Sequence, residues 1–228
     1  TEMGVVGTIF QDRIPSVAAF QLPFLFTDYD QARAALYEGD YGYQLIGDVA
    51  SLGFTVNGIV PDGFRVMTMN KKVESLADMH GLKMRMPNLE IMVEIGNYLG
   101  FAVTPMSMTE VFSALEQGVI DGQENPPSTI RSQGWYEIQD YLLVSNHVFT
   151  SLFLCVNNDF YNSLDSELQN ILDEVIDETC AQIWDTAQTQ AQEDLDYMSS
   201  EGGIEVYEPS DSFRQEMVEA TAPMYDNM

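Results

Sequence analysis

Short apolar runs alternate with amphipathic stretches along most of the 228-residue chain. Strand-like runs occupy residues 20–26, 53–60, 64–70, 82–88, 101–105 and 119–121, and helical patterns occupy residues 27–39, 89–100, 109–118 and 165–199. Strands that alternate with helices are typical of βαβ units, in which neighbouring strands run parallel. The pattern therefore predicts an α/β fold with mostly parallel sheets.

Capping and turn residues mark several ends of these elements. Thr27 and Asp28 are suited to begin the helix at 27–39, and Thr109 is suited to cap the helix that follows it. The sequence Pro-Asp-Gly at 61–63 predicts a turn between two strands.

Three segments that carry polar groups fall at the carboxyl ends of successive predicted strands. They are Arg85, the loop 105–108 and Asn125. In open α/β sheets, ligands bind in the crevice outside these strand ends. The order of elements thus predicts a ligand site built from these three segments.

The charge balance excludes several classes of partner. Acidic residues outnumber basic ones by 36 to 9, which gives a formal net charge of -27. A field of this sign repels both nucleic acid and anionic membrane surfaces, so neither is an expected partner. No run of about 20 apolar residues is present, so we expect no direct membrane insertion. The 45% of hydrophobic residues excludes intrinsic disorder.

The sequence lacks the motifs of the common enzyme classes. It has no nucleophile elbow, no phosphate-binding glycine loop and no dinucleotide fingerprint. With His80 and His147 as the two histidines, a histidine-rich metal site is excluded, and we expect no cofactor and no metal. Cys155 and Cys180 are compatible with one disulfide or with two buried thiols.

Two of the few basic residues stand in apolar strands. Arg65 lies in the run 64–70 and Arg85 in the run 82–88. A guanidinium that emerges there beside a cleft can hold a carboxylate through two parallel charge-assisted hydrogen bonds. An internal salt bridge to one of the 36 acids is the alternative for both arginines. The alternative interpretation of Asn125, which precedes Pro126, is that it is only a turn residue.

Several longer motifs resemble one family of transport proteins. The runs FRVMT (64–68), GLKMRMPN (81–88), DGQENP (121–126) and WYEIQDYLLVSNH (135–147) look like those of the solute-binding proteins of tripartite ATP-independent periplasmic (TRAP) transporters, the DctP family. The runs PSVAAFQLPFLFTDYDQA (15–32) and LFLCVNNDFYNSL (152–164) fit the same pattern. The likeness covers nearly all of the chain.

This resemblance implies an α/β, two-lobed periplasmic-binding-protein fold (type II-like), with hinge strands and a long connecting helix. We expect lobe I to comprise residues 1–63 and 151–190, and lobe II residues 64–150 and 191–228. Compared with the family, the chain begins after the first strand and the first helix. Lobe I is therefore expected to be incomplete at its N-terminus.

The resemblance also implies a set of ligand-binding residues. Arg85 matches the principal arginine of the family, which pairs with the ligand carboxylate. Arg65 matches a second arginine found in many members, and Asn125 matches an asparagine that bonds the same region of the ligand. Met108 stands where several members have an aromatic residue, so the apolar wall is expected to be softer here.

The implied function is that of a periplasmic (extracytoplasmic) solute-binding subunit, not an enzyme. The expected ligand is a small organic acid, either a sugar acid such as a uronate or a C4-dicarboxylate, and the expected protein partners are the small and large TRAP membrane subunits. Three alternatives stay open. They are an ectoine-like compatible solute as ligand, an enzyme on the same scaffold with Asp121 or Glu124 as acid-base group, and a truncated chain that has lost binding or is completed by a partner.

Overall fold

The computed structural model describes residues 1–7, 10–11 and 13–226. The structure is mixed α/β, and the chain divides into two compact units. Unit 1 comprises Thr1–Phe20, Phe26–Gly63 and Phe149–Thr189. Unit 2 comprises Gln21–Leu25, Phe64–Val148 and Gln190–Met228.

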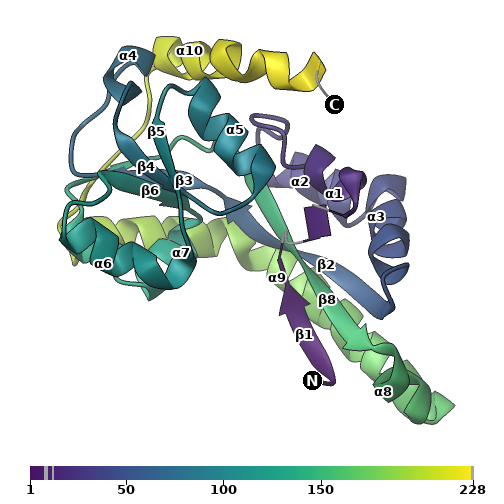
Figure 1. Ribbon diagram of the computed structural model, residues 1–228. Helices are drawn as coiled ribbons and strands as arrows, with labels where there is room; N and C mark the ends of the chain where they lie inside the picture. The colour runs from purple at the N-terminus through teal and green to yellow at the C-terminus, as the bar shows by residue number, and fades with distance from the viewer. Residues whose placement is uncertain (8–9, 12, 227–228) are drawn as a thin grey trace. The chain divides into compact units, whose positions relative to one another are not determined.

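Unit 1 is built on a three-stranded sheet with the order β1-β8-β2. Its strands are β1 (Met3–Val6), β2 (Phe54–Phe64, whose last residue opens unit 2) and β8 (Phe149–Asn157). Its helices are α1 (Pro15–Ala19), α2 (Tyr29–Leu36), α3 (Asp40–Ala50), α8 (Asn158–Ser163) and the first part of α9 (Ser166–Ser200). The first part of α9 runs along β2 and β8 (Figure 1).

The long helix closes the core of unit 1. Ile176 and Cys180 of α9 pack with Val60 of β2 and Val156 of β8. Cys155 and Cys180 are both free and buried, and burial raises the pKa of each thiol to about 11. Of the two options for these cysteines, the structure thus shows buried thiols, which behave as small apolar side chains.

Unit 2 is built on a six-stranded sheet with the order β5-β4-β6-β3-β7-β9. The strands are β3 (Val66–Met69), β4 (Lys83–Met86), β5 (Ala102–Pro105), β6 (Gly122–Asn125), β7 (Tyr141–Leu143) and β9 (Glu205–Tyr207). Strand β4 is parallel to β5 and β6, and β7 is parallel to β9, whereas β3 is antiparallel to β6 and β7. The sheet is therefore mixed, not purely parallel.

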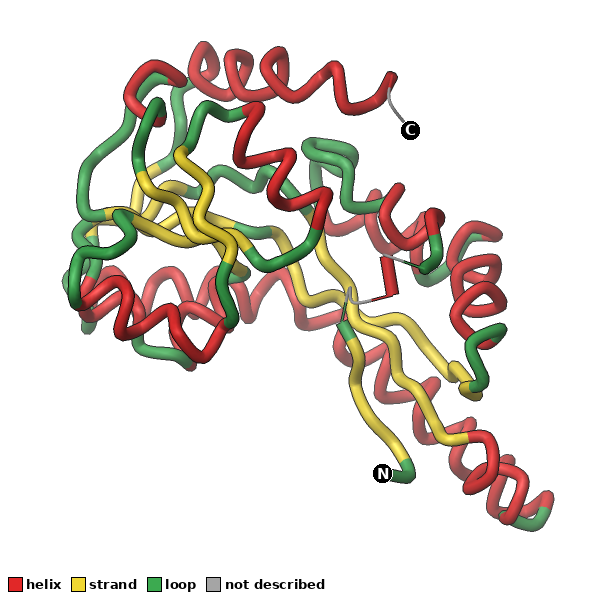
Figure 2. The backbone as a smooth tube through the Cα atoms, in the orientation of Figure 1, coloured by secondary structure: helices red, strands yellow, loops and turns green. Residues whose placement is uncertain are grey.

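Helices cover both faces of this sheet (Figures 1 and 2). One face carries Met67, Met69, Met84 and Met86, which pack against α5 (Glu90–Tyr98) and α10 (Asp211–Thr221). The other face packs against α6 (Val111–Glu116), α7 (Pro127–Ser132) and the end of α9. The remaining short helices are α4 (Leu76–Met79), η2 (Met108–Glu110), η3 (Trp135–Ile138) and η4 (Ala222–Asp226).

Two predictions for the first 63 residues are wrong, a strand at 20–26 and a turn at 61–63. Residues 20–26 form turns, and Phe24 adopts a positive φ of 59° that no strand contains. Residues 61–63 are no turn, because β2 continues through them to Phe64. Strand β2 is an edge strand, where a proline is tolerated since its missing N–H faces no partner.

Two expectations after α5 also need correction. The residue that caps the helix start is Ser107 and not Thr109, because Ser107 forms a capping box with Glu110. The strand predicted at 119–121 begins three residues later, at Gly122. The N–H of Val119 is used to close helix α6, since it donates to the Ala114 carbonyl at 2.9 Å.

The predicted helix at 165–199 is confirmed as α9, but not all of its apolar residues are buried. Ile176, Cys180, Trp184, Leu195 and Met198 are buried. Near the start of the helix, Leu168, Ile171 and Val175 are each about half exposed, with relative exposures of 49%, 49% and 53%. The periodicity predicted the helix correctly but overstated the width of its buried face.

Candidate functional site

Four polar side chains form a row across one face of the sheet in unit 2. The register pairs Thr104 of β5 with Arg85 of β4, Arg85 with Gln123 of β6, and Gln123 with Thr68 of β3. Paired residues on neighbouring strands project from the same face, so the four side chains lie side by side. We call Thr104, Arg85, Gln123 and Thr68 the polar row.

Arg85 is a buried cation whose hydrogen bonds, within the described ranges, go to the main chain. Its Nε and Nη2 atoms donate to the main-chain oxygen of Met106, at 3.1 and 2.8 Å. Desolvation lowers the pKa of Arg85 to about 10, with Glu124 raising it and Arg65 lowering it further. Throughout the described part of the chain, no Asp or Glu oxygen lies within ion-pair distance of Arg85. A charge kept in this state suits a visiting anion.

Arg65, in contrast, is committed to an internal acid. Both Nε and Nη2 donate to the carboxylate of Glu124, the second at 2.8 Å, and Nη2 also lies 2.8 Å from the Glu124 carbonyl oxygen. The same Nη2 donates to Asn125 Oδ1 at 3.1 Å. Arg65 therefore balances the negative charge of Glu124, and it also reaches the end of β6.

Glu124 is the buried anion of this end of the sheet. Burial pushes the pKa of Glu124 upward, but the charge of Arg65 and the neighbouring His147 outweigh burial, so the pKa is lowered from its ordinary value. His147 Nε2 lies 3.4 Å from Glu124 Oε2, and His147 Nδ1 lies 2.8 Å from Ser145 Oγ. The carboxylate thus stays ionised inside the protein.

Asn125 is bonded on both ends of its side-chain amide. Its Oδ1 accepts from Arg65, and its Nδ2 donates to Gln123 Oε1 at 2.7 Å. Gln123 Nε2 lies 3.0 Å from Thr68 Oγ1. Asn125 is therefore the middle member of a buried series of hydrogen bonds from Arg65 to Thr68, which goes beyond the role of a local turn residue.

Met108 lies on the turn that also carries the carbonyl bound by Arg85. Its side chain is 42% exposed. The side chain of Ser107 and the carboxylate of Glu110 cap each other's main chain and so fix this turn directly after Met106. The exposed thioether of Met108 therefore lies two residues after the Met106 carbonyl that accepts hydrogen bonds from Arg85.

The structure brings Arg65, Arg85 and Asn125 to the same end of the sheet, with Met108 on the adjoining turn. Gln123, Thr68 and His147 also belong to this network and were missed from the sequence. Gln123 was hidden because the strand was predicted at 119–121, whereas β6 spans Gly122–Asn125.

Asp121 and Glu124, the two acids considered as acid-base groups, both accept hydrogen bonds from within the protein. Asp121 Oδ2 accepts the main-chain N–H of Lys83 at 2.8 Å, and Glu124 is held by Arg65. Within the described ranges, no cluster of three or more His, Cys, Asp or Glu side chains is arranged to hold a metal ion.

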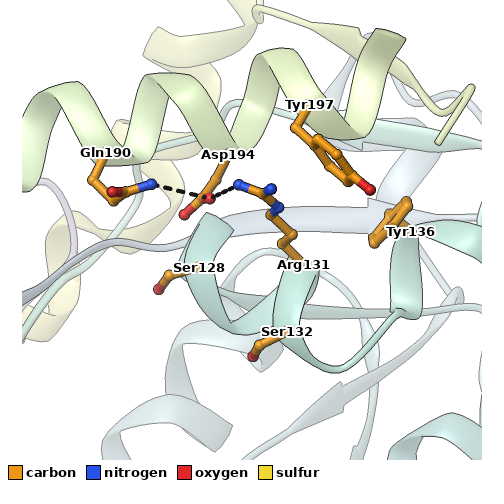
Figure 3. A pocket seen from close by; sticks show the side chains of 7 residues that line it. All are labelled: Ser128, Arg131, Ser132, Tyr136, Gln190, Asp194 and Tyr197. Carbon is orange, nitrogen blue, oxygen red and sulfur yellow. Dashed lines mark hydrogen bonds and ion pairs between the residues drawn. The ribbon is translucent and has the colours of Figure 1, made fainter. Parts of the chain in front are cut away.

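A hollow of about 470 Å³ lies elsewhere in unit 2, between α7 and the end of α9 (Figure 3). Arg131 points across it and forms a 2.7 Å ion pair with Asp194, and its guanidinium carbon lies 3.8 Å from the centre of the Tyr197 ring. Because Arg131 has its own carboxylate, this hollow lacks the unpaired charge that distinguishes Arg85.

No helix in the described portion of the protein is both long and apolar enough to span a bilayer.

The whole chain, residues 1–228, matches the family model described as bacterial extracellular solute-binding protein, family 7 (DctP). It is 30% identical over 209 residues to the C4-dicarboxylate-binding periplasmic protein DctP of Rhodobacter capsulatus. This match covers 92% of the chain and 62% of the relative, so the chain spans less than two thirds of that protein.

Two of the similar solved structures hold sugar acids. One is a TRAP periplasmic solute-binding protein from Haemophilus influenzae with bound L-gulonate, at 32% identity and a TM-score of 0.88, covering 99% of this chain and 74% of that one. The other is the sugar acid binding protein DctPAm from Advenella mimigardefordensis in complex with galactonate, at 28% identity and a TM-score of 0.91, covering 99% of this chain and 73% of that one.

Proposed function

Because this chain belongs to family 7 of the bacterial extracellular solute-binding proteins, the DctP family, we propose that it captures a small carboxylate-bearing solute in the periplasm for a TRAP transporter. The proposed ligand is a sugar acid, such as a uronate or an aldonate, or a C4-dicarboxylate. The proposed partners are the small and large membrane subunits of that transporter.

The observation that carries this proposal is the state of Arg85. Its charge is buried, and its hydrogen bonds go to a main-chain carbonyl of Met106. A carboxylate that enters beside it gains charge-assisted hydrogen bonds, each contributing about 1.5 to 3 kcal/mol. The protein has already met the desolvation cost of the cation during folding, so the anion benefits from a preorganised partner.

The other proposed site residues have separate roles. Asn125 donates a side-chain N–H to the same region of the solute, and Arg65 holds Asn125 in place while Glu124 balances the charge of Arg65. Met108 forms part of the apolar wall. A micromolar affinity needs about 8.2 kcal/mol, so the arginine contact must be joined by further hydrogen bonds and apolar burial.

The names of similar proteins support an acidic ligand without choosing one. The relative from Rhodobacter capsulatus is named for C4-dicarboxylates, and the two similar structures hold L-gulonate and galactonate. All of these solutes carry a carboxylate. An ectoine-like zwitterion also carries one, so it belongs in the test panel.

The test is isothermal titration with L-gulonate, D-galactonate, D-glucuronate, succinate and ectoine. We expect at least one acid to bind the wild-type protein and Arg85→Ala to weaken that binding at least about 100-fold, because two charge-assisted bonds are lost. Arg13→Ala is the matched control, since it removes the same charge from an exposed position. Binding by Arg85→Ala within a few fold of wild type contradicts the assignment.

The enzyme alternative has its own readout. Incubation of the bound acid with the protein, followed by mass spectrometry, is expected to return the acid unchanged. A product that disappears in a Glu124→Gln variant is the result that favours an enzyme over a binding protein.

A further inference from the structure

Gln123 is the member of the polar row that lies beside Arg85 and also bonds Asn125, and the proposed site gives it no role. Its side chain is completely buried, and its Cα neighbours across the sheet are Arg85 on β4 and Thr68 on β3. A buried primary amide is costly unless both its donor and its acceptor have partners. Gln123 satisfies both, through Asn125 and Thr68.

The direction of this hydrogen-bonded chain is set by Arg65. A guanidinium can only donate, so the Asn125 atom at 3.1 Å from Arg65 Nη2 must be the oxygen Oδ1. The nitrogen of Asn125 then faces Gln123 and donates to Oε1 at 2.7 Å. Gln123 is left to donate from Nε2 to Thr68 Oγ1 at 3.0 Å.

The starting point of the chain is itself held. Glu124 accepts two hydrogen bonds from Arg65 and is completely buried, so the guanidinium has little freedom to turn. The order Glu124, Arg65, Asn125, Gln123, Thr68 therefore has a single consistent assignment of donors and acceptors.

We propose that Gln123 is a positioning and specificity-determining residue that fixes the Asn125 amide so that it offers the solute an N–H. The proposal rests on the proposed function and goes beyond it, because it names the hydrogen-bonding character of the solute group. Asn125 Oδ1 is taken by Arg65, and one of the two N–H groups of Nδ2 is taken by Gln123. Among the residues that the structure describes, the second N–H of Nδ2 has no partner.

The solute group that meets Asn125 must therefore be an acceptor. A carboxylate oxygen satisfies both this N–H and Arg85, whereas an ammonium or amide N–H facing Asn125 finds no acceptor there. The site thus selects for an oxygen at this place and rejects analogues that present nitrogen-bound hydrogen.

The absence of charge on the Gln123 side chain also matters for ligand binding by Arg85. As the register neighbour of Arg85, it lies on the strand next to that guanidinium, which has no carboxylate partner among the described residues. A carboxylate at position 123 still accepts from Asn125, but it also supplies Arg85 with an internal anion. The amide therefore serves Asn125 without competing for the charge that the solute needs.

Two substitutions separate these contributions. Gln123→Met keeps the length of the side chain and removes both hydrogen bonds, and Gln123→Glu keeps the acceptor and adds a charge. Ser132→Ala is the control, because Ser132 Oγ bonds only to the Thr129 carbonyl of its own helix in the described structure. Thr68→Val removes the far end of the chain with little change of volume and serves if Gln123→Met fails to fold.

The first readout is the solvent exchange of the Asn125 side-chain amide protons, measured by NMR without any ligand. We expect Gln123→Met or Thr68→Val to accelerate this exchange about ten-fold or more and Ser132→Ala to leave it unchanged. Equal exchange in Gln123→Met and wild type overturns the proposal.

The second readout is the dissociation constant for L-gulonate, D-galactonate and succinate. We expect Gln123→Met to weaken binding of the bound acid about ten-fold and Gln123→Glu about 100-fold. If Gln123→Glu binds as wild type does, the proposal is wrong. If none of the acids binds the wild-type protein, the proposed ligand class fails, while the amide exchange of Asn125 still decides the role of Gln123.

Discussion

Arg65 and Arg85 are both buried in the same unit, yet they stand in opposite electrostatic states. Arg65 is paired with Glu124, whereas Arg85 bonds a main-chain carbonyl. Removing one member of a buried pair leaves an uncompensated charge, while removing an unpaired cation relieves one. The two arginines are thus expected to respond to mutation in opposite ways.

We expect Glu124→Gln to lower the free energy of unfolding by about 3 to 5 kcal/mol, because Arg65 loses its counter-charge. Arg85→Met is expected to leave stability unchanged or to raise it, since a binding group is often held at the expense of stability. Urea unfolding at neutral pH measures both. Equal destabilisation by the two variants contradicts this distinction.

The ion pair between Glu124 and Arg65 is expected to make the stability of the protein depend on pH. The pKa of Glu124 is lowered by folding from its ordinary value of 4.5, so its ion pair contributes stability above pH 4.5. That contribution is lost as the pH falls below 4.5, through the lowered pKa. The stability difference between wild type and Glu124→Gln should therefore shrink in acid, when urea unfolding is repeated between pH 7 and pH 3.

At the scale of elements, the turn beside the site depends on the cap at its start. Ser107 Oγ accepts a hydrogen bond from the N–H of Thr109 at 3.3 Å. Glu110 Oε2 accepts one from the N–H of Ser107 at 3.0 Å. We expect Ser107→Ala to cost about 1 kcal/mol of unfolding free energy, as for other lost caps. Thr109→Ala, at the position that the sequence pattern favoured, should cost less than Ser107→Ala when both variants are unfolded in urea.

Elements with strong periodicity were predicted well from the sequence. Helix α9 and the segment β4-α5-β5 were expected within one or two residues, because their apolar spacing is regular and glycine or proline marks their ends. Helix α3 was missed. Turn residues misled the prediction at 61–63, where an edge strand accepts a proline, and at 122–125, where a strand of mostly polar residues carries no apolar pattern.

The candidate site could be predicted only in part for a related reason. Motifs pointed to Arg65, Arg85 and Asn125, but which arginine is neutralised depends on the register that brings Glu124 beside Arg65. Register is set by tertiary pairing and leaves little trace in a four-residue strand. The lobe boundaries at 63/64, 150/151 and 190/191 stay a prediction.

For the whole molecule, the net charge of -27 acts against an anionic solute. The Debye length falls from about 30 Å at 0.01 M salt to about 8 Å at 0.15 M, so salt shields the approaching acid from distant carboxylates. We expect the association rate to rise about three-fold or more over this range in stopped-flow measurements, with the dissociation rate nearly constant. An association rate that falls with salt indicates instead that the field near Arg85 dominates the approach.

The methionines of unit 2 differ sharply in their access to solvent. Met67, Met69, Met84 and Met86 are completely buried, whereas Met108 is 42% exposed. Peroxide converts an accessible thioether into a polar sulfoxide, while packed thioethers are protected. Mild oxidation would therefore alter Met108, in the proposed apolar wall, before it damages the core, and a reductase that restores the thioether would renew the protein without refolding it.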